Sequence, residues 1–278
     1  MQQKIKVLKQ TANQLRRDVL MMTHLACSGH PGGALSCAEI MACLYFSEMN
    51  VDPKNPKWED RDRFVLSKGH ACPALYSVLS QKGFFPIEEL KKLRKLGALL
   101  QGHPDMKTPG VDITTGSLGQ GVSVGIGMAL GARLLKKQFR TYVLIGDGDV
   151  QEGQLWEGAM FAAHKKIDNL LVIYDFNKLT DLPVGELTAI EPVAEKFESF
   201  GWQTMEINGH DVKEILDAFE KARRTKGKPT VIIAHTTKGK GVSYMENVGK
   251  WHGSCGPNKE EYEKGTSELN EEGNLICK

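Results

Sequence analysis

The alternation of apolar runs with amphipathic segments in the second half of the chain constrains its fold most. From about residue 110, the strand-like runs "TYVLIGD", "NLLVIYDFN", "WQTMEIN" and "PTVIIAHTT" alternate with helix-like segments such as "EGQLWEGAMFAAHKK" and "DVKEILDAFEKARRT". Apolar runs rich in β-branched residues, separated by amphipathic helices, are typical of parallel strands covered on both faces. The pattern predicts an α/β fold with a central parallel sheet and helices on both faces.

The first part of the chain is predicted to be mostly helical. Apolar positions recur at helical spacing over 4–26, and "CAEIMACLYFSEMN", "CPALYSVLSQKG" and "IEELKKLRKLG" indicate further helices. The stretch "SGHPGGALS" interrupts the first two helices, and "FVLSKGH" predicts a short strand that ends in a glycine turn. The basic run in "IEELKKLRKLG" is interpreted as a solvated helix face.

The chain is interpreted as a single domain over residues 1–278. No Pro- or Ser-rich linker divides it, and a chain of 278 residues can bury a substantial core. The polar segment from about 265, "TSELNEEGNLICK", is expected to be a weakly ordered tail that ends the subunit.

Composition excludes several classes of function. The 36 basic and 34 acidic residues leave a net charge of +2, so no nucleic-acid partner is expected. The N-terminal segment is charged throughout, and the longest weakly polar run contains glycines and Arg133, so neither a signal peptide nor a membrane span is expected. None of the six cysteines forms a C-x-x-C pair, which favours reduced thiols in a cytoplasmic protein.

Polar residues follow two of the predicted strands. Asp147 stands between Gly146 and Gly148 after "TYVLIG", and Asn177 ends "NLLVIYDFN". Ligands of open α/β sheets bind at the carboxyl ends of the strands, and Asp and Asn oxygens suit Mg²⁺ when substrate phosphates complete its coordination. A lone G-D-G is a weak signal, because many turns contain one.

The spacing and the surrounding phrases make the signal specific. Residues 149–176 leave room for one helix and one strand, and "GDG…N" at this spacing resembles the thiamine diphosphate motif. The chain resembles the transketolase family in six phrases that occur in the family's order: "SGHPGGALS", "FVLSKGHACPALY", "QGHPD", "TTGSLGQGVSVGIGMALG", "GDGDVQEGQLWEGAMFAA" and "KGKGVSYMENVGKWHG". The resemblance implies a thiamin diphosphate-binding fold and a diphosphate-binding domain.

The resemblance also implies roles for individual residues. The metal, Mg²⁺ with Ca²⁺ or Mn²⁺ as alternatives, would be held by Asp147, the Asn177 side chain and the Leu179 carbonyl. The cofactor thiamine diphosphate would contact His70, His252, Gly148, Gly116 and Leu118, the last two beside its rings. The sugar would face His30, His103 and His252, and Glu152 would couple two active sites across a subunit interface. Phe176 departs from the family pattern and is expected beside the metal.

Histidines taken singly are more often structural than catalytic, but four of the eight here lie in glycine-bounded loops. These four are the ones named by the resemblance. His24, His164 and His210 lack that context and are interpreted as structural, whereas His235 ends a predicted strand and is a weaker candidate. Imidazole suits a reaction that moves protons near neutral pH.

The resemblance covers only the diphosphate-binding part of a transketolase. In the family, a pyrimidine-binding domain supplies the rest of the cofactor site and most groups that bind the sugar phosphate. We therefore expect a split enzyme, in which this N-terminal subunit joins a separate C-terminal subunit in an α₂β₂ assembly and transfers a two-carbon ketol unit between sugar phosphates. Xylulose 5-phosphate and ribose 5-phosphate are the family's usual pair.

Three other functions fit the cofactor motif less well. A 2-oxoacid dehydrogenase α-type subunit carries it without a reason for four glycine-bounded histidines. A half of a 1-deoxyxylulose-phosphate synthase is disfavoured by "SGHPGG" and "WHGSCGP". A catalytically silent partner that binds the cofactor for assembly would not need histidines facing a sugar.

Overall fold

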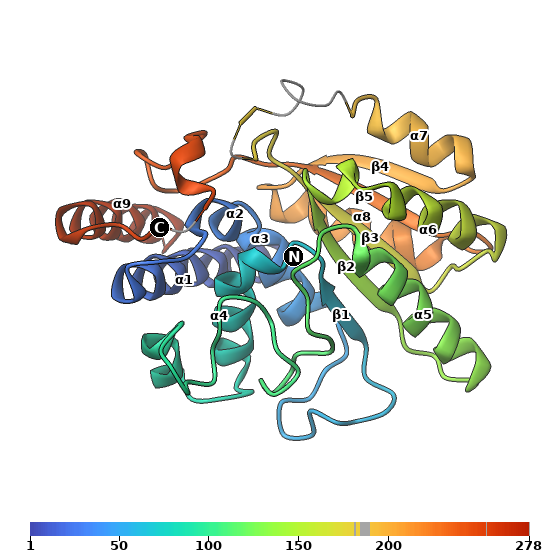
Figure 1. Cartoon of the computed structure of the whole chain (residues 1–278), viewed down its shortest axis with the longest axis horizontal. Helices are drawn as coiled ribbons and strands as arrows, with labels where there is room; N and C mark the ends of the chain where they lie inside the picture. Colours follow the sequence, from blue (N-terminus) through green and yellow to red (C-terminus); the bar gives the residue numbers. More distant parts are fainter. Residues whose placement is uncertain (181, 184–189, 254, 278) are drawn as a thin grey trace.

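The computed structural model describes residues 1–180, 182–183, 190–253 and 255–277. Within these ranges the strands form a five-stranded, fully parallel sheet in the order β1-β2-β3-β5-β4 (Figure 1). The strands are β1 (Arg63–Leu66), β2 (Thr141–Gly146), β3 (Leu170–Phe176), β4 (Gln203–Asn208) and β5 (Thr230–His235). Each coincides with a strand-like run in the sequence, so the predicted α/β class with a parallel sheet is confirmed.

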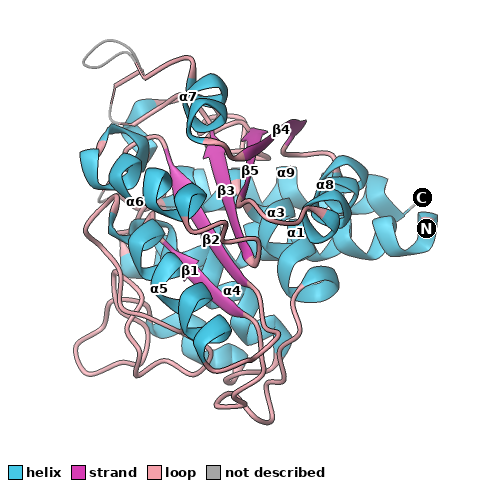
Figure 2. Cartoon of the chain, turned by 90° about the vertical axis from the view of Figure 1, so that its right-hand side faces the viewer, coloured by secondary structure: helices cyan, strands magenta, loops and turns pink. Residues whose placement is uncertain are grey.

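Helices cover both faces of the sheet (Figure 2). One face packs on α1 (Gln2–Ala26), α3 (Ala38–Cys43), α4 (Cys72–Lys82) and α8 (Val212–Arg224). The other face packs on α5 (Gln120–Leu134), α6 (Gly153–His164) and α7 (Val193–Phe200). Alternate residues of one strand serve opposite faces: Leu144 of β2 joins the first core, and Val143 and Ile145 join the second. This double burial explains the unbroken apolar runs.

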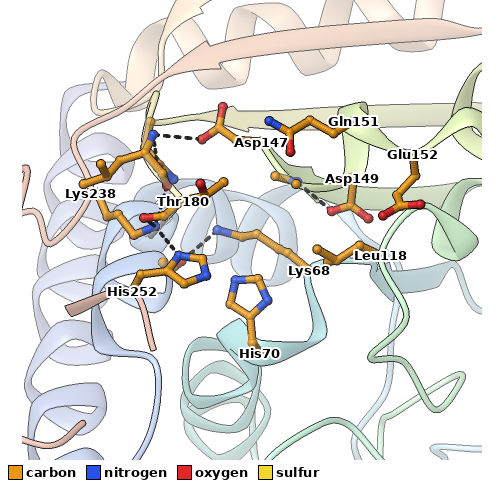
Figure 3. Close-up of a pocket in the computed structure, with 15 residues that line it drawn as sticks. Lys68, His70, Leu118, Asp147, Asp149, Gln151, Glu152, Thr180, Lys238 and His252 are labelled. Carbon is orange, nitrogen blue, oxygen red and sulfur yellow. Dashed lines mark hydrogen bonds between the residues drawn. The ribbon is translucent and has the colours of Figure 1, made fainter. Parts of the chain in front are cut away.

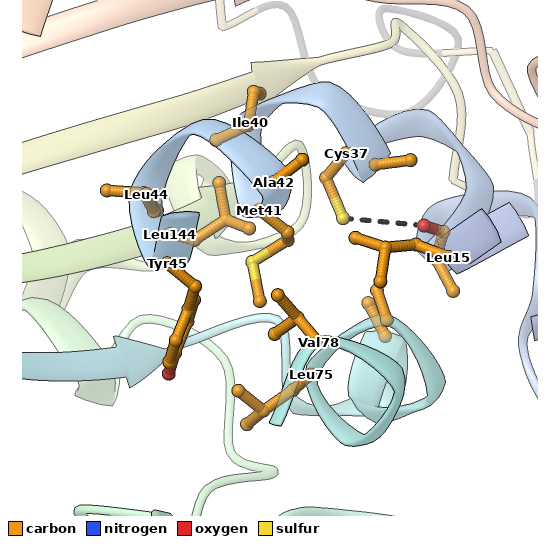
Figure 4. Close-up of a cluster of buried hydrophobic side chains, with 14 of the residues drawn as sticks. Leu15, Cys37, Ile40, Met41, Ala42, Leu44, Tyr45, Leu75, Val78 and Leu144 are labelled. Atoms are coloured by element: carbon orange, nitrogen blue, oxygen red, sulfur yellow. Dashed lines mark hydrogen bonds between the residues drawn. The ribbon is translucent and has the colours of Figure 1, made fainter. Parts of the chain in front are cut away.

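The first core is centred on the short helix α3. Figure 4 shows Met41 of this helix between Leu144 of β2 and the side chains of Leu75 and Val78 on α4. All four side chains are buried. The packing fixes the N-terminal helical layer against the sheet, and with it the loops that carry His30 and His70.

The C-terminal segment differs from the sequence expectation. The tail expected to be weakly ordered forms most of the helix α9 (Lys259–Cys277), which packs along α1 (Figure 1). Leu269 is completely buried, and a Cβ at Gly265 would lie 2.9 Å from Leu20. The tail prediction is therefore wrong, because close docking on α1 stabilises a segment whose own composition is polar.

Two further segments of the N-terminal half differ in detail. The stretch "SGHPGGALS", predicted as a break, contains the one-and-a-half-turn helix α2 (Pro31–Ser36), which has proline at its first position. The helix expected over 87–97 is reduced to a 3₁₀ helix, Ile87–Lys92. Among the described helices, none combines the length and apolar character needed to span a bilayer.

Candidate active site

A cleft of about 230 Å³ lies at the carboxyl ends of β2 and β3 (Figure 3). The register pairs Gly146 with Asp175, which places the residues that follow both strands at the same edge. Loops from distant parts of the chain complete the lining, which includes Lys68, His70, Leu118, Asp147, Gly148, Glu152, Asn177, Leu179, Lys238 and His252. This is the position at which ligands of open α/β sheets bind.

The three groups predicted as metal ligands lie together in this cleft. The Leu179 N–H donates to Asp147 Oδ2 and to Asn177 Oδ1, at 3.3 Å in each case. Side-chain oxygens from two neighbouring strand ends therefore converge on one point. The Leu179 carbonyl, predicted as the third ligand, accepts a hydrogen bond from Lys238 Nζ.

The environment of Asp147 fits a divalent cation. The side chain is only 3% exposed, and burial, with a further contribution from the charge of Asp175, raises its pKa to about 6. The Tyr174 hydroxyl opposes that shift by donating to Asp147 Oδ1 at 2.7 Å. A desolvated carboxylate gains strongly from a nearby cation, and one carboxylate beside one amide oxygen suits Mg²⁺.

A buried ion pair lies directly behind these oxygens. Lys68 Nζ bonds to Asp175 Oδ2 and donates to the Gly33 carbonyl at 2.7 Å. Asp175 also accepts from Ser36 Oγ at 2.6 Å and from Asn177 Nδ2 at 3.3 Å. Because a carboxylate only accepts, this contact turns the Asn177 amide nitrogen inward and leaves Oδ1 facing the cleft.

The same pair sets the charge behind the site. Burial acts to raise the pKa of Asp175, but Lys68 outweighs it and keeps the pKa below its usual value. Burial acts to lower the pKa of Lys68, and Asp175 reverses that direction. Both groups are therefore ionised at neutral pH, and the cleft holds a fixed ammonium group beside Gly33.

The second aspartate of "GDGD" has a structural role. Asp149 is buried and accepts hydrogen bonds from Ser67 Oγ, the Gly119 N–H at 2.8 Å and the Gly146 N–H at 2.9 Å. It therefore ties the turn after β2 to the glycine-rich loop before α5. This contact places Leu118 against Gly148, where a Cβ on the glycine would meet the leucine at 2.7 Å.

Three of the four predicted active-site histidines form a cluster at the cleft. The ring centroids of His30 and His70 and those of His70 and His252 are 5.2 Å apart, and His30 and His252 are separated by 6.1 Å. Burial, followed by nearby positive charge, lowers the pKa of His30 to about 4 and that of His70 well below its usual value. Both rings are therefore neutral at physiological pH.

The fourth histidine lies beside the glycine-rich loop. A Cβ on Gly116 would fall 3.3 Å from the ring of His103, so these two predicted site residues are in contact. Burial and then Arg94 lower the pKa of His103. The same arginine lies beside His30, which links His103 to the cluster.

The family model described as "Transketolase, thiamine diphosphate binding domain" matches residues 7–267. This chain belongs to the transketolase family. Its match covers the strand-end oxygens, the buried lysines and all four clustered or loop histidines described above. The expectation drawn from the sequence motifs is confirmed at the level of the family and of its thiamine diphosphate-binding domain.

Two relatives within the transketolase family match this chain over nearly their whole length. A subunit of the apulose-4-phosphate transketolase of Phocaeicola vulgatus is 41% identical over 268 residues, covering 96% of this chain and 95% of that protein. The 6-deoxy-6-sulfo-D-fructose transketolase subunit SqwG of a Clostridium species is 46% identical over 241 residues, covering 86% and 88%. Both relatives are named as subunits.

Longer transketolases match this chain over only part of their own length. Mouse transketolase is 45% identical over 257 residues, which cover 91% of this chain and 40% of the mouse protein. The crystal structure of Campylobacter jejuni transketolase superposes with a TM-score of 0.90 at 39% identity, covering 96% of this chain and 43% of that one. The chain thus corresponds to less than half of each longer transketolase.

The remaining histidines of this transketolase chain lie outside the cleft. His24 stacks on Tyr262 with ring centroids 4.3 Å apart, and His210 bonds to Glu39. His235, the weaker candidate, is exposed and pairs with Glu206 on the neighbouring strand at 2.7 Å. Phe176 is buried and stacks on Tyr174; it does not line the cleft.

Glu152 and two buried lysines also line the cleft. Glu152 lines the cleft at the start of α6, where its side chain is exposed and lies against Gly119. Lys68 and Lys238 were not expected at the site from the sequence, although each is only 2% exposed. Lys238 Nζ contacts the Leu179 carbonyl and His252 Nδ1 (Figure 3). The one signal in the sequence is that each lysine directly precedes a glycine in a motif phrase.

Proposed function

We propose that this chain is the N-terminal subunit of a split, thiamine diphosphate-dependent transketolase. It would transfer a two-carbon ketol unit from a ketose phosphate to an aldose phosphate, together with a second subunit that carries the pyrimidine-binding domain. The proposal rests on the convergence of Asp147, Asn177, two buried lysines and two histidines, His70 and His252, on one cleft, with His30 packed beside those two rings.

The residues of the cleft suit the two charged ends of such a cofactor. Asp147, the Asn177 side chain and the Leu179 carbonyl would hold Mg²⁺, and Ca²⁺ or Mn²⁺ would fit the same oxygens. His70, His252 and the Gly148 backbone would contact the diphosphate, close to the ammonium groups of Lys68 and Lys238. Gly116 and Leu118 would lie beside the rings. Thiamine diphosphate, when bound, supplies the carbon that adds to the ketose carbonyl and the ring that accepts the electrons of the cleaved carbon–carbon bond.

The histidines would act on the sugar. His30 and His103 are neutral at physiological pH, so each ring can donate one hydrogen bond and accept another. Such rings bind sugar hydroxyls and accept a proton when one is released. His252, whose Nδ1 contacts Lys238, would hold a hydroxyl through its other nitrogen.

The assembly is proposed from the two relatives that are named as subunits. We infer an α₂β₂ arrangement, in which Glu152 at the rim of the cleft couples two sites across a subunit interface, and a cytoplasmic location. The names of these relatives refer to apulose 4-phosphate and to 6-deoxy-6-sulfo-D-fructose. Xylulose 5-phosphate with ribose 5-phosphate, the pair of the pentose phosphate pathway, is the first pair to assay.

The test is ketol transfer by the chain alone and by the chain purified with its second subunit, across a panel of ketose donors. The pair should be active, the chain alone inactive, and Asp147→Ala inactive in the pair. Asp217→Ala, an exposed acid on α8, serves as the matched control and should retain activity. Appreciable transfer by the chain alone would refute the split enzyme, and no transfer by the pair with any ketose would refute the activity.

A further inference from the structure

One residue of the basic segment that begins in the last turn of the 3₁₀ helix turns inward. Lys91, Lys92 and Lys95 are exposed, as expected of a solvated face, but Arg94 is partly buried. Its backbone adopts a left-handed conformation with φ +59°, and its N–H donates to the Leu100 carbonyl at 2.8 Å. A non-glycine residue held in this conformation requires support from its surroundings, and it points the side chain toward the loop that carries His30.

The Arg94 guanidinium is fixed by contacts from two loops. One terminal nitrogen donates to Ser28 Oγ at 2.7 Å, and the other lies 3.4 Å from His30 Nδ1. A Cβ on Gly102 would fall 3.0 Å from Arg94 Nε, so the guanidinium also lies flat against the residue before His103. No carboxylate in the described part of the chain forms an ion pair with Arg94. Its charge therefore acts on the two histidines beside it.

The contact with His30 determines which ring nitrogen carries hydrogen. A guanidinium has donors but no acceptor and stays protonated, so Nδ1 of His30 must accept. A neutral imidazole that accepts at Nδ1 carries its hydrogen on Nε2. A protonated imidazole would place a hydrogen on Nδ1, facing the guanidinium, and this arrangement is excluded by charge and by geometry.

The other groups around His30 also favour its neutral form. His70 and His252 face its ring at 5.2 and 6.1 Å, and burial, Arg94, His252, His103 and Lys238 all lower its pKa, in that order of size. Arg94 is the largest contribution after burial. It also makes a hydrogen-bonding contact to the ring, at Nδ1.

We propose that Arg94 is a positioning residue that fixes His30 as the neutral tautomer with its hydrogen on Nε2. His30 then presents an N–H donor to an oxygen of the bound sugar, in one orientation, throughout the neutral pH range. The tautomer follows from the structure alone, and its use on a sugar rests on the proposed function.

The tautomer is tested by ¹⁵N NMR of histidine side chains in the full chain, with His30→Gln used to assign the resonances. In the unmodified chain, His30 Nδ1 should be unprotonated and Nε2 protonated from pH 8 to 5. Arg94→Met should raise the pKa of His30 by about one unit and populate the tautomer with hydrogen on Nδ1. Lys95→Met removes a charge from the same turn and should change neither property.

Two further variants keep the test decisive if Arg94→Met folds poorly. Ser28→Ala frees the guanidinium without removing its charge. It should therefore populate the His30 tautomer with hydrogen on Nδ1, with a smaller change in the pKa of His30 than Arg94→Met causes. Arg94→Lys keeps the charge but lacks the planar fork, and it should retain the low pKa while losing the single tautomer. A His30 resonance that is unchanged in both variants, or protonated at Nδ1 in the unmodified chain, would overturn the proposal.

Kinetics of the reconstituted pair separate this role from the proposed function. Arg94→Met should lower kcat and shift the acidic limb of the pH profile upward, whereas a merely structural role would lower the yield of folded protein and leave the profile unmoved. If the pair shows no ketol transfer while the NMR results hold, the proposed function fails and the positioning role stands.

Discussion

Tyr174 lies one strand away from Asp147 and donates its hydroxyl hydrogen to Asp147 Oδ1 at 2.7 Å. One carboxylate oxygen is therefore already held by the protein, and Oδ2 is the oxygen directed toward Asn177 Oδ1. The hydroxyl stabilises the ionised carboxylate in a buried position, in which burial favours the protonated form. If Asp147 holds Mg²⁺ as proposed, Tyr174 would contribute to metal binding through this hydrogen bond without touching the metal.

Tyr174→Phe should weaken Mg²⁺ binding in the presence of thiamine diphosphate by on the order of tenfold at pH 7. The ring and its stacking on Phe176 are kept, and only the hydrogen bond to a charged group is lost. The pKa of Asp147 then rises further, and protons compete better with the metal. Calorimetric titration measures the affinity, with Tyr262→Phe as a control away from the cleft; equal affinities for Tyr174→Phe and the unmodified chain would contradict the role.

Lys68→Met should destabilise the fold by about 3–5 kcal/mol, because it leaves the buried Asp175 carboxylate without its cation. Urea unfolding monitored by circular dichroism measures the change. Lys213→Met is the matched control, since Lys213 pairs with Asp217 on the exposed surface of α8 and its loss should not be detectable. Similar midpoints for the two variants would show that Lys68 is not a structural cation.

Glu39 should make stability depend on pH in the acid range. Burial acts to raise its pKa, but Arg16 at 2.6 Å and His210 at 3.1 Å outweigh it and lower the pKa to about 2 from an ordinary 4.5. Because the folded pKa is the lower one, this stabilisation is complete above about pH 4.5. It is lost as the pH falls toward 2, and amounts to on the order of 3 kcal/mol.

The Glu39 effect is measured by urea unfolding at pH values from 7 to 3. Glu39→Gln should be less stable at pH 7 and should lose less stability on acidification than the unmodified chain. Asp217→Asn, on the surface, should leave the slope unaltered. Parallel pH profiles for Glu39→Gln and the unmodified chain would rule out the assigned pKa direction.

Leu269→Ala should lower the free energy of unfolding by about 2–5 kcal/mol, because the Leu269 side chain is completely buried on α9, which packs along α1. Leu275→Ala, on the same helix but with a side chain 69% exposed, should have little effect. Thermal unfolding of both variants distinguishes a docked helix from a weakly ordered tail. Equal melting temperatures would favour the tail.

The sequence patterns were sufficient for the sheet because β2, β3 and β5 are buried on both faces and read as unbroken apolar runs. They were insufficient for α9, in which Gly265 and Gly273 lower helix propensity, although Gly265 is what lets the helix approach Leu20. The break assigned to "SGHPGGALS" failed for a similar reason. Gly32 would place a Cβ 2.9 Å from the Trp251 carbonyl, so the glycines there permit packing within a helix.

Most residues singled out by the sequence motifs line the cleft, whereas His30, His103 and Gly116 are not among its lining residues. The partners of the lining residues were not visible in the motifs. Lys68, Asp175 and Tyr174 act through burial and hydrogen bonding, which no single-residue pattern encodes. Arg94 is a clear example, because its segment has the composition of a solvated face. A left-handed backbone at one residue directs that side chain inward.

The packing of α9 along α1 has a consequence for synthesis on the ribosome. Helix α1 ends at Ala26 and α9 begins at Lys259, so the first helix leaves the exit tunnel long before the last. At roughly 5–20 residues per second, the surface of α1 that α9 covers stays uncovered for about 10–50 seconds. During that interval the nascent chain exposes apolar side chains to chaperones and to neighbouring chains. The cleft, whose lining runs from Gly33 to His252, is also incomplete for most of this time.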